Sequence, residues 1–169
     1  MTPAARKSGS QARSQSLGEE IATFVGADSF GTDQAKAVWQ KLKPAMPEIL
    51  DGFYASIAKH PTLAPKLGVK GEYVPRLKDA QTDHWDYIFN HEPDLEFEAR
   101  AVKIGEAHVR INLEPKWYLA SYGRLLVEAI PALASRHRLQ PTKLAEALQV
   151  LVSRTFLDMI VSYDAYENG

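Results

Sequence analysis

One histidine of this chain stands among apolar residues at helical spacing. Ala101, Ile104 and Gly105 precede His108 on the same side of a helix, and Ile111 follows it. Such a face can lie flat against a planar apolar group, because glycine allows close backbone approach. A neutral imidazole on that face is a possible metal ligand. The same spacing also fits an ordinary core helix with a buried histidine.

The composition limits the kinds of partner and chemistry. The chain has 169 residues, enough for one domain with one core, and a net charge of −1 that does not favour nucleic acid or membrane as partner. It contains no cysteine, which excludes disulfides, thiolate metal sites and covalently attached haem. No apolar run approaches the ~20 residues of a membrane span, and no secretory signal is visible. We therefore expect a cytoplasmic protein.

The elements that position His108 are expected to be helices. Residues 1–16 are polar and have little to bury, so we expect a disordered arm, followed by one domain over residues 17–169. Proline, glycine and capping residues divide that domain into helices. The expected helices are 17–25, 32–42, about 47–59, about 71–89, 94–112, 115–135 and 141 to beyond 160.

No segment alternates with the period of two that strands require, so the predicted fold class is all-α. The last two expected helices carry more apolar positions than a small core needs. Leu126, Leu133, Leu151 and Phe156 are the positions that could pair with a second copy of the chain. They could equally complete the core of a monomer.

A motif around His108 narrows these possibilities. The run Gly105-Glu-Ala-His108-Val-Arg-Ile-Asn-Leu-Glu-Pro-Lys-Trp-Tyr118 resembles the His-x-Arg-Ile-Gly-Leu-x-Pro-x-Trp-Tyr signature of the sensor globins in globin-coupled sensors. A Phe53-Tyr54 pair and a His84-Trp85 pair stand where that family has them. The resemblance extends from about Leu17 to the carboxyl end. It implies a globin fold with an extra short amino-terminal helix and a non-covalent haem b between helices.

The resemblance also implies roles for individual residues. His108 would be the proximal ligand of the haem iron, with the carbonyl of Ile104 as acceptor for its other ring nitrogen. Tyr54 would donate a distal hydrogen bond to bound dioxygen, although it could simply be a core aromatic residue beside Phe53. The further residues expected to contact the cofactor are Phe53, Leu77, Ala80, Gln81, Ile104, Gly105, Ile111 and Tyr118.

One competitor and two departures from the signature are visible. His84 could approach the iron from the far side, but its position one turn beyond Ala80 favours a packing or surface role. Asn112 replaces the usual glycine of the signature, and Ser121 stands where glycine or alanine is common. Asparagine tolerates the left-handed backbone that glycine provides, so we expect the turn to be kept.

The function implied by the resemblance is a haem-based gas sensor domain, with dioxygen as the expected principal ligand and carbon monoxide and nitric oxide as further ligands. It would signal through a homodimer built on the last two helices to an output domain absent from this chain. In the family, that output domain is a diguanylate cyclase, a histidine kinase or a chemotaxis transducer, so the domain itself would not be an enzyme. The alternatives are a free-standing globin for dioxygen binding or nitric oxide dioxygenation, and an all-α interaction module without haem.

Overall fold

The computed structural model describes residues 15–168 and consists of helices and their connections, without strands in that range. The predicted all-α class is confirmed. The expected arm falls almost entirely on residues 1–14, which lie outside the described residues. The α-helices are α1 (Leu17–Val25), α2 (Thr32–Leu42), α3 (Met46–Lys59), α4 (Val74–Asn90), α5 (Leu95–Arg110), α6 (Pro115–Ser135) and α7 (Pro141–Asn168). Short 3-10 turns are η1 (Ala27–Ser29), η2 (Lys43–Ala45), η3 (Ala64–Leu67) and η4 (Val69–Gly71).

Local sequence signals account for the ends of the helices around His108. The Asp94 carboxylate accepts hydrogen bonds from the first backbone amides of α5, as expected for a capping residue. Pro115 is the first residue of α6, where its missing N–H costs nothing. Between these helices Asn112 has a φ of 52°, the left-handed conformation that the sequence predicted for this replacement of glycine. The turn after His108 is therefore kept.

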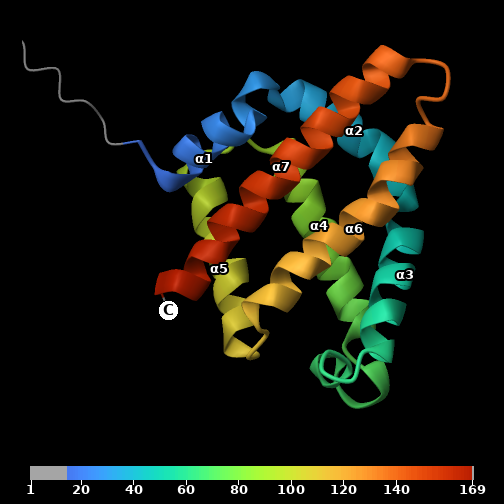
Figure 1. The fold of residues 1–169 in the computed structure, drawn as a ribbon, viewed down its shortest axis with the longest axis vertical. Coiled ribbons are helices and arrows are strands. Elements are labelled where there is room, and N and C mark those ends of the chain that lie inside the picture. Colours follow the sequence, from blue (N-terminus) through green and yellow to red (C-terminus); the bar gives the residue numbers. More distant parts are fainter. Residues whose placement is uncertain (1–14, 169) are drawn as a thin grey trace, which may run out of the picture.

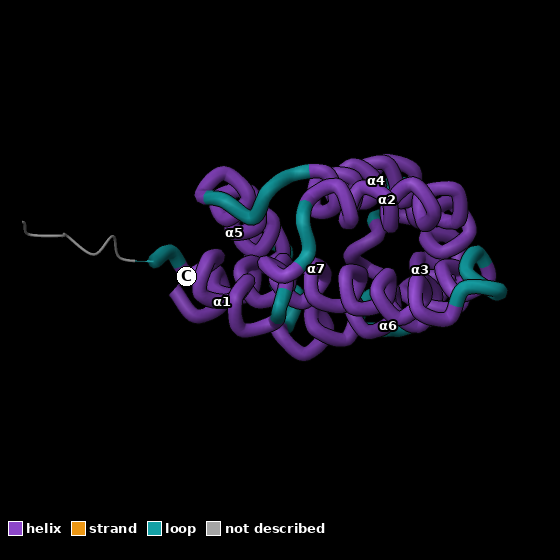
Figure 2. Tube along the Cα trace, turned by 90° about the horizontal axis from the view of Figure 1, so that it is seen from above, coloured by secondary structure: helices purple, strands orange, loops and turns teal. Residues whose placement is uncertain are grey.

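The helices form two layers. In Figure 1, α6 and α7 cross in front of α4. Figure 2 shows the separation from above, with α4 and α5 on one side and α6 and α7 on the other. The segment between α3 and α4 and the turn between α5 and α6 both lie at the lower end of the molecule in Figure 1. No helix within residues 15–168 is long and apolar enough to span a membrane.

Helix α7 buries a more polar face than the sequence suggested. Arg154, Asp158 and Ser162 are buried, whereas Phe156 is 39 % exposed. Arg154 donates hydrogen bonds to the carbonyls of Ile88 and His91 at the end of α4, which have no partner inside their own helix. The inward face of α7 is thus set by polar contacts as well as by apolar packing.

A glycine sets how closely α5 approaches α7. A Cβ atom built on Gly105 would lie 1.9 Å from the carbonyl oxygen of Ser162 and 2.9 Å from the Cβ of Ala165. These separations are far below van der Waals contact, so only glycine fits without moving the α7 backbone. Gly105 therefore faces α7.

We expect Gly105→Ala to destabilise the fold by about 3 kcal/mol or more, because the methyl group meets backbone rather than a flexible side chain. Gly123→Ala is the matched control, since nothing lies within 4 Å of its added Cβ. In mid-helix that change should stabilise by about 0.5–1 kcal/mol. Urea unfolding measures both. Equal effects of the two substitutions would contradict the close contact.

Candidate functional site

A pocket opens between the two layers and is lined mainly by apolar side chains. Its cavity has a volume of about 130 Å³ and is partly open to solvent. Helices α3, α4, α5 and α6 and the segment between α3 and α4 form its walls. The lining residues are Phe53, Tyr54, Ile57, Leu63, Lys66, Leu67, Leu77, Gln81, His84, Ile104, His108, Ile111, Leu113, Tyr118, Ser121, Tyr122 and Leu125.

His108 enters this pocket from the last turn of α5. Its Nδ1 lies 2.8 Å from the carbonyl oxygen of Ile104, one turn earlier, so Nδ1 carries the proton and donates it. The acceptor predicted from the sequence is the one observed. Burial lowers the pKa of His108, although the bond to Ile104 opposes that effect. The ring is thus held neutral, with the lone pair of Nε2 free among the described residues.

Tyr54 projects from α3 into the same pocket. Its ring packs edge-on against Phe53, with centroids 5.0 Å apart. Burial raises the pKa of Tyr54 to about 12, so the phenol keeps its proton at neutral pH. Among residues 15–168 its hydroxyl makes no hydrogen bond. The pocket therefore holds an unused hydrogen-bond donor as well as an unused nitrogen lone pair.

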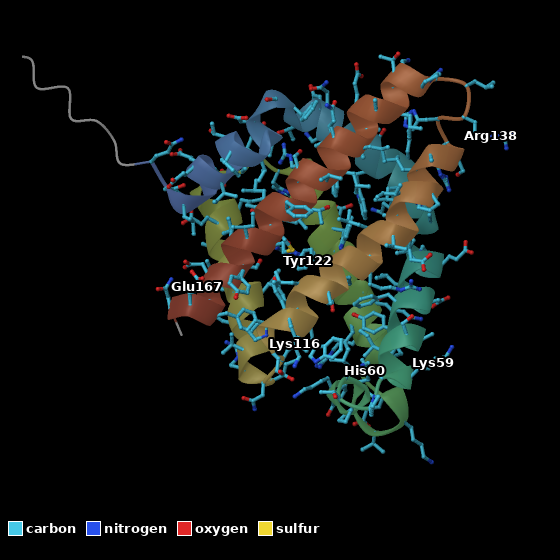
Figure 3. All side chains as sticks on the ribbon, viewed as in Figure 1. Lys59, His60, Lys116, Tyr122, Arg138 and Glu167 are labelled. Atoms are coloured by element: carbon cyan, nitrogen blue, oxygen red, sulfur yellow. The ribbon has the colours of Figure 1, made fainter. Side chains whose placement is uncertain are left out.

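A buried polar network adjoins the pocket and joins three helices. The carboxylate of Asp158 on α7 is 2.9 Å from Nε2 of His84 on α4 and accepts a 2.7 Å hydrogen bond from the Tyr122 hydroxyl on α6. Tyr122 lies between α6 and α7 near the centre of Figure 3. Its hydroxyl is also 3.0 Å from that of Tyr118, whose ring packs against His108 with centroids 5.0 Å apart. The network therefore reaches the surroundings of His108 through Tyr118.

His84 belongs to this network and is buried. The sequence favoured a packing or surface role for it, and Asp158 on α7 gives it a packing role. Its Nδ1 is buried without a hydrogen-bond partner in the described part of the chain. Burial and the neighbouring negative charge of Asp158 raise the pKa of Tyr122 well above its usual value. Tyr122 therefore remains a donor to the carboxylate.

A family model identifies the family, and a solved structure shows the fold. The Protoglobin family model matches residues 17–169. The chain belongs to the protoglobin family. Its structure is similar to the globin domain of a Geobacter sulfurreducens globin-coupled sensor, with a TM-score of 0.72 and 19 % sequence identity over 87 % of this chain and 95 % of that one. This likeness confirms the globin fold, and the two matches together confirm the resemblance drawn from the signature.

Membership of the protoglobin family implies haem binding, and the pocket residues fit such a group. The lining is apolar, as a porphyrin face requires. The pocket also contains an imidazole whose Nε2 is free and whose Nδ1 is already bonded, the arrangement found for histidine ligands of metals. When bound, a haem would supply an iron able to bind a diatomic gas.

Most of the residues singled out in the sequence line the pocket of this protoglobin. Those that line it are Phe53, Tyr54, Leu77, Gln81, Ile104, His108, Ile111 and Tyr118. Ala80 and Gly105 do not line it. Ala80 is exposed on α4, because the pocket side of that helix carries Leu77, Gln81 and His84. Gly105 packs against α7, so its close approach is to another helix and not to a ligand.

Sequence reasoning missed several lining residues of this protoglobin for two different reasons. Ile57 and Leu125 continue the helical faces of Phe53 and Tyr118, so extending the period by one or two turns would have found them. Lys66 and Leu67 lie in an irregular segment where no period applies. Asp158 could have been suspected from an acidic residue on an otherwise inward face.

We expect Tyr122→Phe to destabilise the protein by about 1.5–3 kcal/mol, because it removes a hydrogen bond to a buried carboxylate. Tyr166→Phe is the matched control, since the Tyr166 hydroxyl is buried without a partner. Its loss should change the free energy of unfolding by less than about 0.5 kcal/mol. Denaturant unfolding of the two variants tests this. A loss as large for Tyr166→Phe as for Tyr122→Phe would contradict the role of the Asp158 network.

Proposed function

We propose that this protein is a haem-based gas sensor domain, with dioxygen as its principal ligand and haem b as its cofactor. The observation that carries the proposal is the state of His108 within an apolar pocket. Its Nδ1 donates to Ile104 and its Nε2 is free. Nε2 of His108 would be the proximal ligand, and the Ile104 carbonyl would fix the ring orientation and increase its basicity.

A role as a plain core histidine explains this arrangement less well. A core histidine is enclosed by packed side chains, whereas His108 is only partly buried and lines the pocket. In His108 only Nδ1 is satisfied by the described residues, and the free nitrogen belongs to a side chain that lines the pocket. Iron ligation would explain both nitrogens, because Nε2 would bind the iron while Nδ1 donates to Ile104.

Tyr54 would select the gas. Its phenol is protonated and uncommitted, and can donate to the partly negative outer oxygen of bound dioxygen. Carbon monoxide carries less charge and would benefit less from this bond. Leu77 and Gln81 from α4 and Phe53 from α3 would complete the distal surroundings, whereas Ile104, Ile111 and Tyr118 would pack against the proximal side.

Aromatic contacts offer a route from the proximal histidine to the end of α7. Tyr118 touches His108, and its ring lies 5.3 Å from that of Tyr166, in the last turns of α7. A displacement of His108 would therefore be transmitted through Tyr118 to the carboxyl-terminal end of α7, after which an output segment would follow. To signal, the gas must bind two states of the domain with different affinity, since equal binding to both shifts nothing. A relative described as a globin-coupled sensor supports this use.

A homodimer through α6 and α7 would provide the two states. Among the four residues first considered for this contact, Leu133 and Leu151 are fully buried in the core and are unsuited to it. The exposed apolar residues of the two helices are better candidates. They are Leu119, Val127, Ile130, Val152 and Phe156. Exposed apolar side chains gathered on two adjacent helices are typical of a protein–protein contact.

We expect the purified wild-type chain to show the absorption of a histidine-ligated haem. His108→Ala should lose this spectrum, and added imidazole should restore it, because the free base can enter the vacated space. His91→Ala is the control. His91 also contacts the carbonyl of the residue four earlier through Nδ1, but it is exposed outside the pocket. An unchanged iron spectrum in His108→Ala would disprove ligation.

We expect Tyr54→Phe to accelerate dioxygen dissociation roughly 5- to 150-fold, the equivalent of one lost hydrogen bond. Carbon monoxide dissociation should change by less than about threefold, since that ligand gains little from a donor. Tyr73→Phe, an exposed tyrosine outside the pocket, serves as control. Stopped-flow or flash photolysis gives both rates. Equal acceleration for the two gases would refute the proposed selection.

We expect Phe156→Glu to weaken self-association at least about tenfold, because it places a charge in an apolar contact. Phe24→Glu is the control, since Phe24 is more exposed but lies on α1. Sedimentation equilibrium distinguishes them. A wild-type chain that stays monomeric at high micromolar concentration would rule out the homodimer.

A further inference from the structure

One lysine stands out in the lining of the apolar pocket. Lys66 lies on η3, in the segment between α3 and α4, and is half-buried. Among the side chains that line the pocket, it alone is a lysine, arginine, aspartate or glutamate. An ammonium group beside apolar walls is costly unless it has a partner. The Lys66 ammonium is therefore expected to have a polar or anionic partner.

Lys66 reaches across the mouth of the pocket. Its Nζ donates to the backbone carbonyl of Ile111, the residue after α5. Ile111 is 47 % exposed, so this contact lies where the pocket meets solvent. The two segments that it joins are the ones at the lower end of the molecule in Figure 1.

The Ile111 carbonyl meets only part of the hydrogen-bonding capacity of the Lys66 ammonium. An ammonium has three donors, and the Ile111 oxygen takes one of them. The ion pairs within residues 15–168 do not include Lys66. Because Ile111 lies at the negative end of the α5 dipole, the contact holds the ammonium in place without neutralising it. The lysine can therefore pair with an anion at the pocket mouth.

We propose that Lys66 receives a carboxylate of the cofactor, a propionate of the haem, and so fixes which edge of the cofactor faces the mouth. This inference rests on the proposed haem function. A carboxylate needs water or a cation, whereas the rest of the porphyrin needs apolar walls. Lys66 provides the cation at the rim and leaves the apolar lining for the ring. It is a positioning residue and takes no part in gas binding.

The test compares natural haem with its dimethyl ester, which has the same ring but no carboxylate. Each ferric form is loaded into the full chain, and its loss to an excess of haem-free myoglobin is followed by absorption. Lys66→Met should speed loss of haem roughly 3- to 10-fold, the range of a partly exposed charge-assisted bond. It should leave loss of the ester unchanged. Lys66→Arg should behave as wild type for both.

Lys59→Met is the matched control, since Lys59 lies on α3 and points away from the molecule in Figure 3. Loss of haem and ester accelerated equally by Lys66→Met would show a structural effect and overturn the proposal, as would unchanged loss of haem. A wild-type chain that takes up neither form would instead refute the proposed haem function. The two failures are therefore distinguishable.

Discussion

The contact between Gly105 and the Ser162 carbonyl is the constraint on which the rest of the structure depends. It brings α5 against α7 more closely than any side chain would allow. Gly105 lies against the α7 backbone, and Ile104 and His108, on the adjoining side of the same helix, line the pocket. One small residue therefore sets how closely the helix that carries His108 packs against α7.

Asp158 contributes a second constraint of a different kind. It is 1 % exposed and is held by His84 and Tyr122, so three helices share one buried carboxylate. Burying a charge costs free energy, and its partners recover that cost only when all of them are in place. The arrangement selects one packing of α4, α6 and α7, where apolar contacts alone would tolerate several. Because α4 and α6 carry walls of the pocket, this packing also fixes where those walls lie.

The sequence predicted the helices and the pocket side of α5 well, and the long-range partners poorly. Capping residues and prolines act within a few positions, so the start of α5 at Asp94 and the start of α6 at Pro115 could be read directly. The signature around His108 also indicated the family. The contact of Gly105 with α7 could not be predicted, because helical spacing puts Gly105 near His108 but cannot say which neighbour lies against it. Asp158 and Lys66 were missed because their partners are distant in sequence.

Helix α7 has a mechanical property that follows from its closest contact with α5. Its 28 residues form one rod about 42 Å long. If the helix tilts where its backbone meets Gly105, the arm toward Pro141 is about 30 Å long and the arm toward Asn168 about 9 Å. The same tilt thus moves the carboxyl-terminal end roughly a third as far as the other end. A segment attached after Asn168 would receive a change of direction with little displacement.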